Sequence, residues 1–172
     1  PLMLDGRDVV GQSQTGTGKT AAFGAPIASI IDPDELVVQA IILVPTRELC
    51  LQVAGELEKL SAPRGIQVVA VYGGRALGPQ VDAIADGAQI VVGTPGRVLD
   101  HIRRRTLRLD HVHVAVLDEC DEMLDIGFAE DIDKILSYTP TPRQTALFSA
   151  TLPPFVLELI DRYLVEPEFV QI

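Results

Sequence analysis

The sequence predicts an α/β fold, a doubly wound and mainly parallel sheet with helices on both faces. Short, continuous apolar runs rich in β-branched residues recur along the 172 residues, and such runs are typical of strands covered on both faces. Segments with helical spacing of apolar residues separate them. Right-handed crossovers then place helices on both faces of the sheet, and ligands bind such sheets beyond the carboxyl ends of the strands.

Each expected strand is one of these apolar runs, and the expected helices lie between them. The strands are predicted at residues 8–10, 40–44, 67–71, 89–93, 112–117, 145–149 and 168–172. Helices are predicted at residues 19–31, 47–60, 78–85, 97–104, 129–137 and 154–164. Within residues 47–60, an apolar stripe recurs at helical spacing and consists of Cys50, Val53, Ala54, Leu57 and Leu60.

Length and composition indicate a single domain over residues 1–172, and the missing initiator Met indicates a fragment. The net charge of −10 argues against a protein coated in basic charge, and no apolar run approaches the roughly 18 residues of a membrane span. Cys50 and Cys120 form no disulfide framework, which favours a cytoplasmic protein. Ordinary surface or strand-end positions are expected for the histidines, which are His101, His111 and His113.

A glycine-rich stretch, GQSQTGTGKT at residues 11–20, follows the first expected strand and leads into a helix. This is the context of a phosphate-binding loop, in which Gly16 and Gly18 let successive N–H groups face one anion. Lys19 would reach the β- and γ-phosphates, and the Thr20 hydroxyl would bind Mg²⁺. A flexible surface turn is the alternative. The expected nucleotide-binding residues are Ser13, Gln14, Thr15, Gly16, Thr17, Gly18, Lys19 and Thr20.

An acidic segment, DECD at residues 118–121, follows the expected strand that ends at Leu117. Asp118 should therefore lie at the carboxyl edge of the sheet, where it would act on Mg²⁺ through water. Glu119 would orient and deprotonate the attacking water. Alternatively, both carboxylates serve only the N-terminus of the next helix, a role that is compatible with catalysis. The absence of asparagine rules out an Asn-Lys-x-Asp guanine motif and favours ATP over GTP.

Six short motifs in this order resemble the first RecA-like domain of a DEAD-box RNA helicase, a P-loop NTPase domain. SQTGTGKT resembles motif I of that family, in which Ser13 is usually Ala. DECD matches motif II with Cys120 in place of Ala. The other matches are PTREL at 45–49, GG at 73–74, TPGR at 94–97 and SAT at 149–151, and the agreement runs from about residue 8 to the C-terminus.

The resemblance implies an RNA-binding face and a link between the two sites. Asp121 would couple ATP hydrolysis to strand separation through hydrogen bonds from Ser149 and Thr151, with a local helix cap as the alternative. The basic run at residues 103–108 could widen the RNA face or be a solvated helix end. Contacts to the RNA backbone, which do not depend on base sequence, are expected from Pro45, Thr46, Arg47, Gly73, Gly74, Thr94, Pro95, Gly96 and Arg97, with a helix cap or β-turn as the alternative for each loop.

By this resemblance the chain is the N-terminal half of an ATP-dependent RNA helicase. The family's adenine-binding Q motif lies upstream of this chain, and its second RecA-like domain supplies the arginines that complete phosphoryl transfer. Since an arginine finger is worth about 10³–10⁵ in rate, the fragment alone is expected to be nearly inactive. Two alternatives are a DNA translocase of the same superfamily and an ATP-gated RNA clamp or scaffold. A nucleotide kinase is disfavoured, since no lid or second substrate pocket is suggested.

Overall fold

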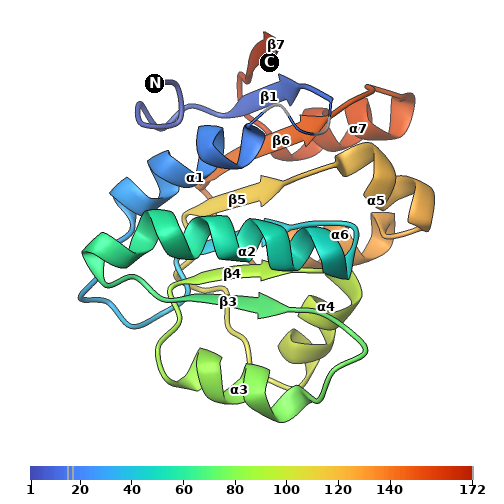
Figure 1. Ribbon diagram of the computed structural model, residues 1–172. Coiled ribbons are helices and arrows are strands. Elements are labelled where there is room, and N and C mark those ends of the chain that lie inside the picture. The colour runs from blue at the N-terminus through green and yellow to red at the C-terminus, as the bar shows by residue number, and fades with distance from the viewer. Residues whose placement is uncertain (15, 17, 172) are drawn as a thin grey trace.

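The computed structural model describes residues 1–14, 16 and 18–171. Its strands form one seven-stranded sheet in the order β3-β4-β2-β5-β6-β1-β7 (Figure 1). Every strand pair is parallel, so the sheet is more uniform than the mainly parallel one predicted. The strands are β1 (Val9–Gln12), β2 (Ala40–Leu43), β3 (Val68–Val71), β4 (Ile90–Gly93), β5 (Val114–Leu117), β6 (Gln144–Ser149) and β7 (Glu168–Gln171).

The register brings the carboxyl ends of the central strands level with one another. The last residue of β2, Leu43, pairs with Gly93 at the end of β4 and with Leu117 at the end of β5. Gln12 at the end of β1 pairs with Ser149 at the end of β6. The loops that follow these strands therefore leave the sheet at one common edge, on the right in Figure 1.

Helices cover both faces of the sheet, as the alternating pattern predicts. α1 (Lys19–Ile30) and α2 (Arg47–Ser61) pack on one face, in front of the strands in Figure 1. The opposite face carries a second core cluster, to which the remaining helices contribute. These are α3 (Leu77–Ala85), α4 (Pro95–Arg103), α5 (Cys120–Ile126), α6 (Ala129–Ser137) and α7 (Pro154–Tyr163).

Two helices depart from the predicted set by more than one residue at an end. α4 begins at Pro95, two residues earlier than predicted, because the fixed φ of proline suits the first helical position. α5 is an additional seven-residue helix directly after the acidic pair. A short 3₁₀ turn at Ala62–Arg64 follows α2.

One prediction about the histidines is wrong, because the His101 side chain is fully buried. It lies in the last turn of α4, on the side of the helix that carries Val98 and Ile102 into the core. Both of its ring nitrogens have polar partners, and these hydrogen bonds offset the free-energy cost of burying the ring.

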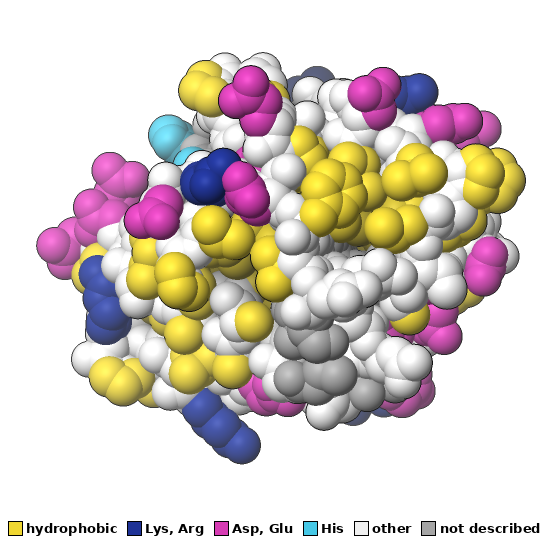
Figure 2. Space-filling view, turned by 90° about the horizontal axis from the view of Figure 1, so that it is seen from above, with side chains coloured by type: hydrophobic (Ala, Val, Ile, Leu, Met, Phe, Trp, Pro, Cys, Tyr) yellow, Lys and Arg dark blue, Asp and Glu magenta, His cyan; other side chains and the backbone are white. Residues whose placement is uncertain are grey.

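Seen from the side of β7, hydrophobic side chains gather in an exposed patch (Figure 2). Phe155 and Leu157 of α7 and Phe169 of β7 are the large exposed hydrophobic residues of these two elements. Among the described residues, none of the helices combines the length and the apolar character needed to cross a bilayer.

Candidate active site and nucleic-acid interface

The glycine-rich stretch forms a loop between β1 and α1. Gly16 and Gly18 have φ of 85° and 80°, in the left-handed region that favours glycine. Gly18 directly precedes the first residue of α1, so the loop leads into a helix N-terminus. Thr15 and Thr17, two of the expected nucleotide-binding residues, lie outside the described residues.

The base of this loop is joined to the end of β6. The backbone N–H of Ser13 donates to the carbonyl of Ser149 at 3.2 Å, and the Gln12 side chain donates to the carbonyl of Ala150 at 3.3 Å. Ser13 is buried, and its hydroxyl lacks a hydrogen-bond partner in the part of the chain that the structure describes. A small buried polar group thus lies at the start of the loop, without a partner among the described residues.

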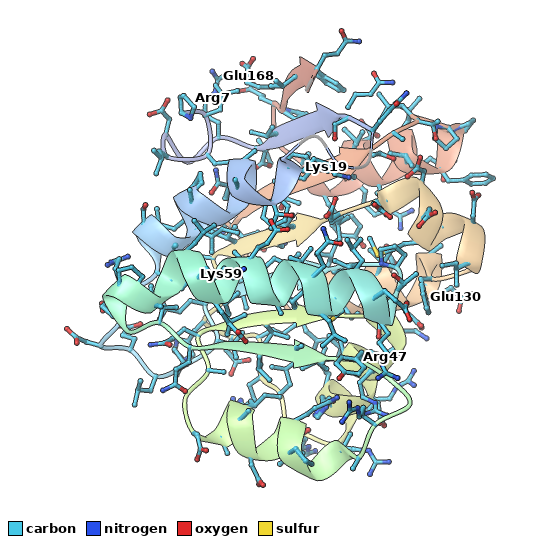
Figure 3. The ribbon with its side chains drawn as sticks, viewed as in Figure 1. Arg7, Lys19, Arg47, Lys59, Glu130 and Glu168 are labelled. Carbon is cyan, nitrogen blue, oxygen red and sulfur yellow. The ribbon has the colours of Figure 1, made fainter. Side chains whose placement is uncertain are left out.

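Lys19 and the acidic pair meet at the carboxyl edge of the sheet. Lys19 Nζ lies 3.2 Å from Asp118 Oδ1 and 3.9 Å from Glu119 Oε1. Lys19 and Asp118 are buried, and Thr20, the next residue of α1, is buried as well. Figure 3 shows Lys19 at the start of α1, on the side to which the strand arrows point. The fold therefore brings together the cation and the carboxylates that the sequence assigned to one site.

Both carboxyl groups of the pair bind protons more tightly than usual. Burial raises the pKa of Asp118, although Lys19 opposes the effect. The pKa of Glu119 is raised to about 7. Burial is the largest cause, a hydrogen bond with Glu122 adds to it, and the charge of Lys19 opposes it. A carboxyl group with a pKa near neutrality suits a group that must accept a proton.

The backbone directs the two carboxylates differently. Glu119 has φ 50° and ψ 51°, a left-handed conformation that is uncommon for a residue other than glycine. It occupies the N-cap position of α5 without making a side-chain cap bond. Asp118 accepts the N–H of Glu119 at 2.9 Å. Strained residues of this kind cluster at functional sites.

Asp121 is held by the segment that follows β6. Its Oδ2 accepts the Thr151 hydroxyl at 2.8 Å and the Thr151 N–H at 3.0 Å, and its own N–H donates to the Ser149 hydroxyl at 3.2 Å. Burial raises the pKa of Asp121, but the hydrogen bonds from Thr151 outweigh burial and the net pKa is lowered. The expected contact between residues 121, 149 and 151 is therefore present.

The PTREL segment combines a helix cap with a stacked arginine. Pro45 follows the end of β2, and the Thr46 hydroxyl accepts the N–H of Leu49 at 3.2 Å as the N-cap of α2. The Arg47 guanidinium lies 5.3 Å from the centroid of the Tyr72 ring. The Arg47 side chain thus contacts the loop after β3 through the Tyr72 ring.

The other two candidate RNA loops are tied to each other. Arg97 Nη1 donates to the carbonyl of Arg75 at 3.1 Å and to Oε1 of Gln80 at 3.3 Å, and the Arg97 side chain is only 16% exposed.

The glycines of these two loops have few steric neighbours. Gly74 has φ 75°. Thr94 precedes α4 without making a side-chain cap bond, and Pro95 and Gly96 form the first turn of that helix. Gly73 and Gly96 have no neighbouring atom closer than 3.9 Å to an added Cβ, so packing alone does not explain glycine at either position.

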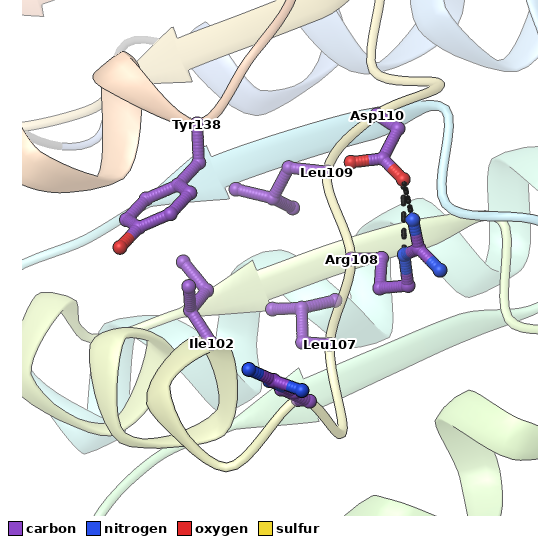
Figure 4. A pocket seen from close by; sticks show the side chains of 7 residues that line it. Ile102, Leu107, Arg108, Leu109, Asp110 and Tyr138 are labelled. Carbon is purple, nitrogen blue, oxygen red and sulfur yellow. Dashed lines mark hydrogen bonds and ion pairs between the residues drawn. The ribbon is translucent and has the colours of Figure 1, made fainter.

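The basic run at residues 103–108 lies at the opposite edge of the sheet from the acidic pair, because it follows the last turn of α4 and precedes β5. Arg104 pairs with Asp100 at 2.9 Å, and Arg108 pairs with Asp110 at 2.7 Å. Figure 4 shows the second pair beside a pocket of about 400 Å³ lined by Ile102, Leu107, Leu109 and Tyr138. This placement favours the solvated helix end over an extension of the RNA face.

Sequence reasoning missed three residues of the candidate interface, namely Tyr72, Gln80 and His101. Tyr72 supports Arg47, and Gln80 contacts both Arg97 and His101. Tyr72 directly precedes the Gly73-Gly74 pair and His101 opens the basic run, but nothing in the sequence marks these side chains or Gln80 as part of the interface. Their contacts exist only where α3, α4 and the end of β3 come together.

The chain belongs to the DEAD/DEAH box helicase family, which matches residues 1–159. The whole chain aligns with 37% of the length of the DEAD-box ATP-dependent RNA helicase CshA of Geobacillus kaustophilus, with 51% sequence identity. It also aligns with 33% of the length of the ATP-dependent RNA helicase CshA of Listeria monocytogenes, with 54% sequence identity. The chain thus spans about a third of the length of these curated relatives.

Two solved structures share the fold. The crystal structure of a DEAD box protein from Methanococcus jannaschii superimposes with a TM-score of 0.95 and 45% identity over 99% of this chain and 47% of that one. A hypothetical ATP-dependent RNA helicase from Sulfolobus tokodaii gives a TM-score of 0.91 with 35% identity, over the full chain and 50% of its own length.

Proposed function

We propose that this chain is the nucleotide-binding half of an ATP-dependent RNA helicase, which couples ATP hydrolysis to local unwinding of RNA or remodelling of RNA–protein complexes. The observation that carries the proposal is the group of Lys19, Asp118 and Glu119 at the carboxyl edge of the sheet, beside the glycine-rich loop. DECD at 118–121 is then the Cys120 variant of the family's acidic motif. Cys120 is fully buried, where a small apolar residue fits equally well.

The nucleotide would bind through the loop at residues 13–18 and the N-terminus of α1. Lys19 leaves its pairing with Asp118 and neutralises the β- and γ-phosphates. The buried Ser13 hydroxyl, which has no hydrogen-bond partner among the described residues, supports a polar ligand at this loop. The Thr20 hydroxyl and the Asp118 carboxylate are the hard oxygen ligands that Mg²⁺ prefers, and they would hold the ion, with Asp118 acting through water. When bound, Mg²⁺ supplies charge neutralisation at the phosphate oxygens.

Glu119 is proposed as the general base. Its carboxylate orients a water molecule for in-line attack on the γ-phosphorus and takes the proton of that water as the new P–O bond forms and the bond to the β-phosphate oxygen breaks. The raised pKa of Glu119 supports this role, because the bound proton is then neither too strongly nor too weakly held near neutral pH.

The RNA backbone would lie across the loops that follow β2, β3 and β4. Thr46 and Thr94 offer hydroxyl donors, Gly73, Gly74 and Gly96 allow close approach of a sugar-phosphate chain, and Arg47 and Arg97 add positive charge. Pro45 and Pro95 shape the turns into α2 and α4. Asp121, held by Ser149 and Thr151, would transmit the state of the ATP site to strand separation.

The remaining parts of the helicase are proposed to lie in a longer protein, since the chain spans about a third of the length of its curated relatives and about half of the length of two solved structures. An adenine-binding segment and a second RecA-like domain would complete the cleft, so the 172-residue chain by itself should hydrolyse almost no ATP. Both cysteines are unpaired, in keeping with a cytoplasmic protein.

The test is Glu119→Gln in the full-length protein, with Asp125→Asn on the same helix as a matched control. Glu119→Gln should abolish RNA-stimulated ATP turnover and leave ATP affinity unchanged, whereas Asp125→Asn should preserve both. Turnover that persists in the Glu119→Gln protein would refute the assignment of the base. Stimulation by DNA in preference to RNA would favour a DNA translocase, and RNA binding gated by ATP with negligible turnover in the wild type would favour a clamp.

A further inference from the structure

Behind the candidate RNA loops lies a buried polar cluster that the proposed mechanism does not use. His101 on α4 is fully buried, and Gln80 on α3 is 7% exposed. Burying an imidazole ring and a primary amide is costly unless each polar atom finds a partner. Two of the partners of Gln80, the Tyr72 carbonyl and Arg97, belong to the candidate RNA loops.

The hydrogen bonds fix the orientation of the Gln80 amide. Its Nε2 donates to the carbonyl of Tyr72 at 3.0 Å, while its Oε1 lies 3.3 Å from Arg97 Nη1 and 2.9 Å from His101 Nε2. Arginine can only donate and a backbone carbonyl can only accept. The amide oxygen must therefore face Arg97, and His101 must carry its proton on Nε2.

The second ring nitrogen of His101 is held as well. Nδ1 lies 2.8 Å from the Thr106 hydroxyl, whose single proton can go either to Nδ1 of the neutral ring or to the His101 carbonyl at 3.1 Å. Burial lowers the pKa of His101, and the nearby positive charge of Arg97 adds to the effect. The neutral ring thus lies between Thr106 and Gln80, and each ring nitrogen has one of them as a polar partner.

We propose that Gln80 is a positioning residue that fixes the three RNA-facing loops relative to one another, and that His101 holds the Gln80 amide in place. The inference rests on the proposed RNA-binding function. Gln80 joins the loop after β3, through the Tyr72 carbonyl, to the TPGR segment, through Arg97. The Tyr72 ring in turn supports Arg47 of the PTREL segment.

The physical reason for such a hub is the regular spacing of phosphates along a strand. Several loops can hold successive phosphates only if their separations are fixed before the RNA arrives, because ordering them on binding would cost affinity. Without the hydrogen bonds of Gln80, each loop could shift independently. The nucleotide site lies at the ends of β1, β5 and β6, on different strands, so its affinity for ATP should be unaffected.

The experiment measures RNA and ATP binding by full-length protein carrying Gln80→Met, a change that keeps the shape of the side chain and removes its hydrogen bonds. A fluorescent single-stranded oligo-uridine RNA and a fluorescent ATP analogue serve as the probes. We expect the Kd for RNA to rise on the order of tenfold, since two buried partners lose their bonds, while the Kd for the ATP analogue stays the same. Gln52→Met, the same change at an exposed site on α2, should alter neither.

A second pair of variants separates positioning from mere packing. His101→Gln retains an N–H donor toward Gln80 and should stay close to the wild type, whereas His101→Phe fills the space without a donor and should weaken RNA binding as Gln80→Met does. Equal behaviour of the two His101 variants would overturn the proposal, as would parallel losses of RNA and ATP binding or unchanged RNA binding by Gln80→Met. Failure of the wild type to bind RNA would instead overturn the proposed function.

Discussion

Replacing Glu119 by Gln should stabilise the nucleotide-free domain at alkaline pH while removing its proposed catalytic base. The pKa of Glu119 is raised from 4.5 to about 7 by burial, then by the hydrogen bond with Glu122. Between these two values the folded chain keeps a proton that the unfolded chain releases. Stability therefore falls as the pH rises through this window, and a neutral amide at the same position escapes the loss.

The magnitude follows from the size of the pKa change. A rise from 4.5 to about 7 corresponds to about 3 kcal/mol if it is expressed in full. The Glu119 side chain is 15% exposed, and solvent screening reduces the effect to about 1–2 kcal/mol. For a chain of this length, this corresponds to a Tm increase of about 2–8 °C.

The assay is thermal unfolding of the 172-residue chain, followed by circular dichroism at about pH 5 and about pH 8 without nucleotide, on either side of most of this window. The Tm of Glu119→Gln should match the wild type at the lower pH and exceed it at the higher one. Asp125→Asn, at an exposed position of the same helix, corrects for the general loss of a negative charge. A Tm difference that is independent of pH, or a variant that is less stable at the higher pH, would refute the reasoning.

Three further predictions concern the coupling contact, the phosphate loop and the thiols. Thr151→Val removes the hydroxyl bond to Asp121 but keeps the backbone one, so the contact should weaken by about 1 kcal/mol; the full-length variant should retain ATPase activity and lose unwinding, as separate assays of the two activities would reveal. Gly18→Ala forces a side chain into φ 80° at a cost of about 1–2 kcal/mol, and titration with a fluorescent ATP analogue should show weaker binding. Burial raises the pKa of Cys50 and Cys120 to about 12, so a disulfide reagent at about pH 8 should label neither thiol until urea unfolds the chain, and rapid native labelling would contradict this.

Much of the fold follows from local patterns. Continuous apolar runs such as residues 40–44 predict strands buried on both faces, and the structure places all of β2 in the core. The segment GTGKT predicts a turn followed by a helix, since its two glycines allow a tight turn directly before the expected helix at Lys19. The end of β5 at Leu117 was likewise predictable, because the apolar run stops there and two carboxylates follow. These features depend on residues close together in the chain, so periodicity and composition determine them.

Only the tertiary structure decided which distant groups meet. The sequence assigned Lys19 and Asp118 to one site, but it could not set the 3.2 Å between the Lys19 ammonium and the Asp118 carboxylate, because that distance depends on the placement of β1 two strands away from β5 in the sheet. The burial of His101 against Gln80 is equally invisible, since neither residue belongs to a periodic pattern. A polar side chain takes whatever partner the packing of other elements supplies, whereas an apolar side chain needs only a buried face. The sequence alone therefore determined the elements and the chemistry carried at their ends, and the packing of the sheet and helices decided how those groups are paired.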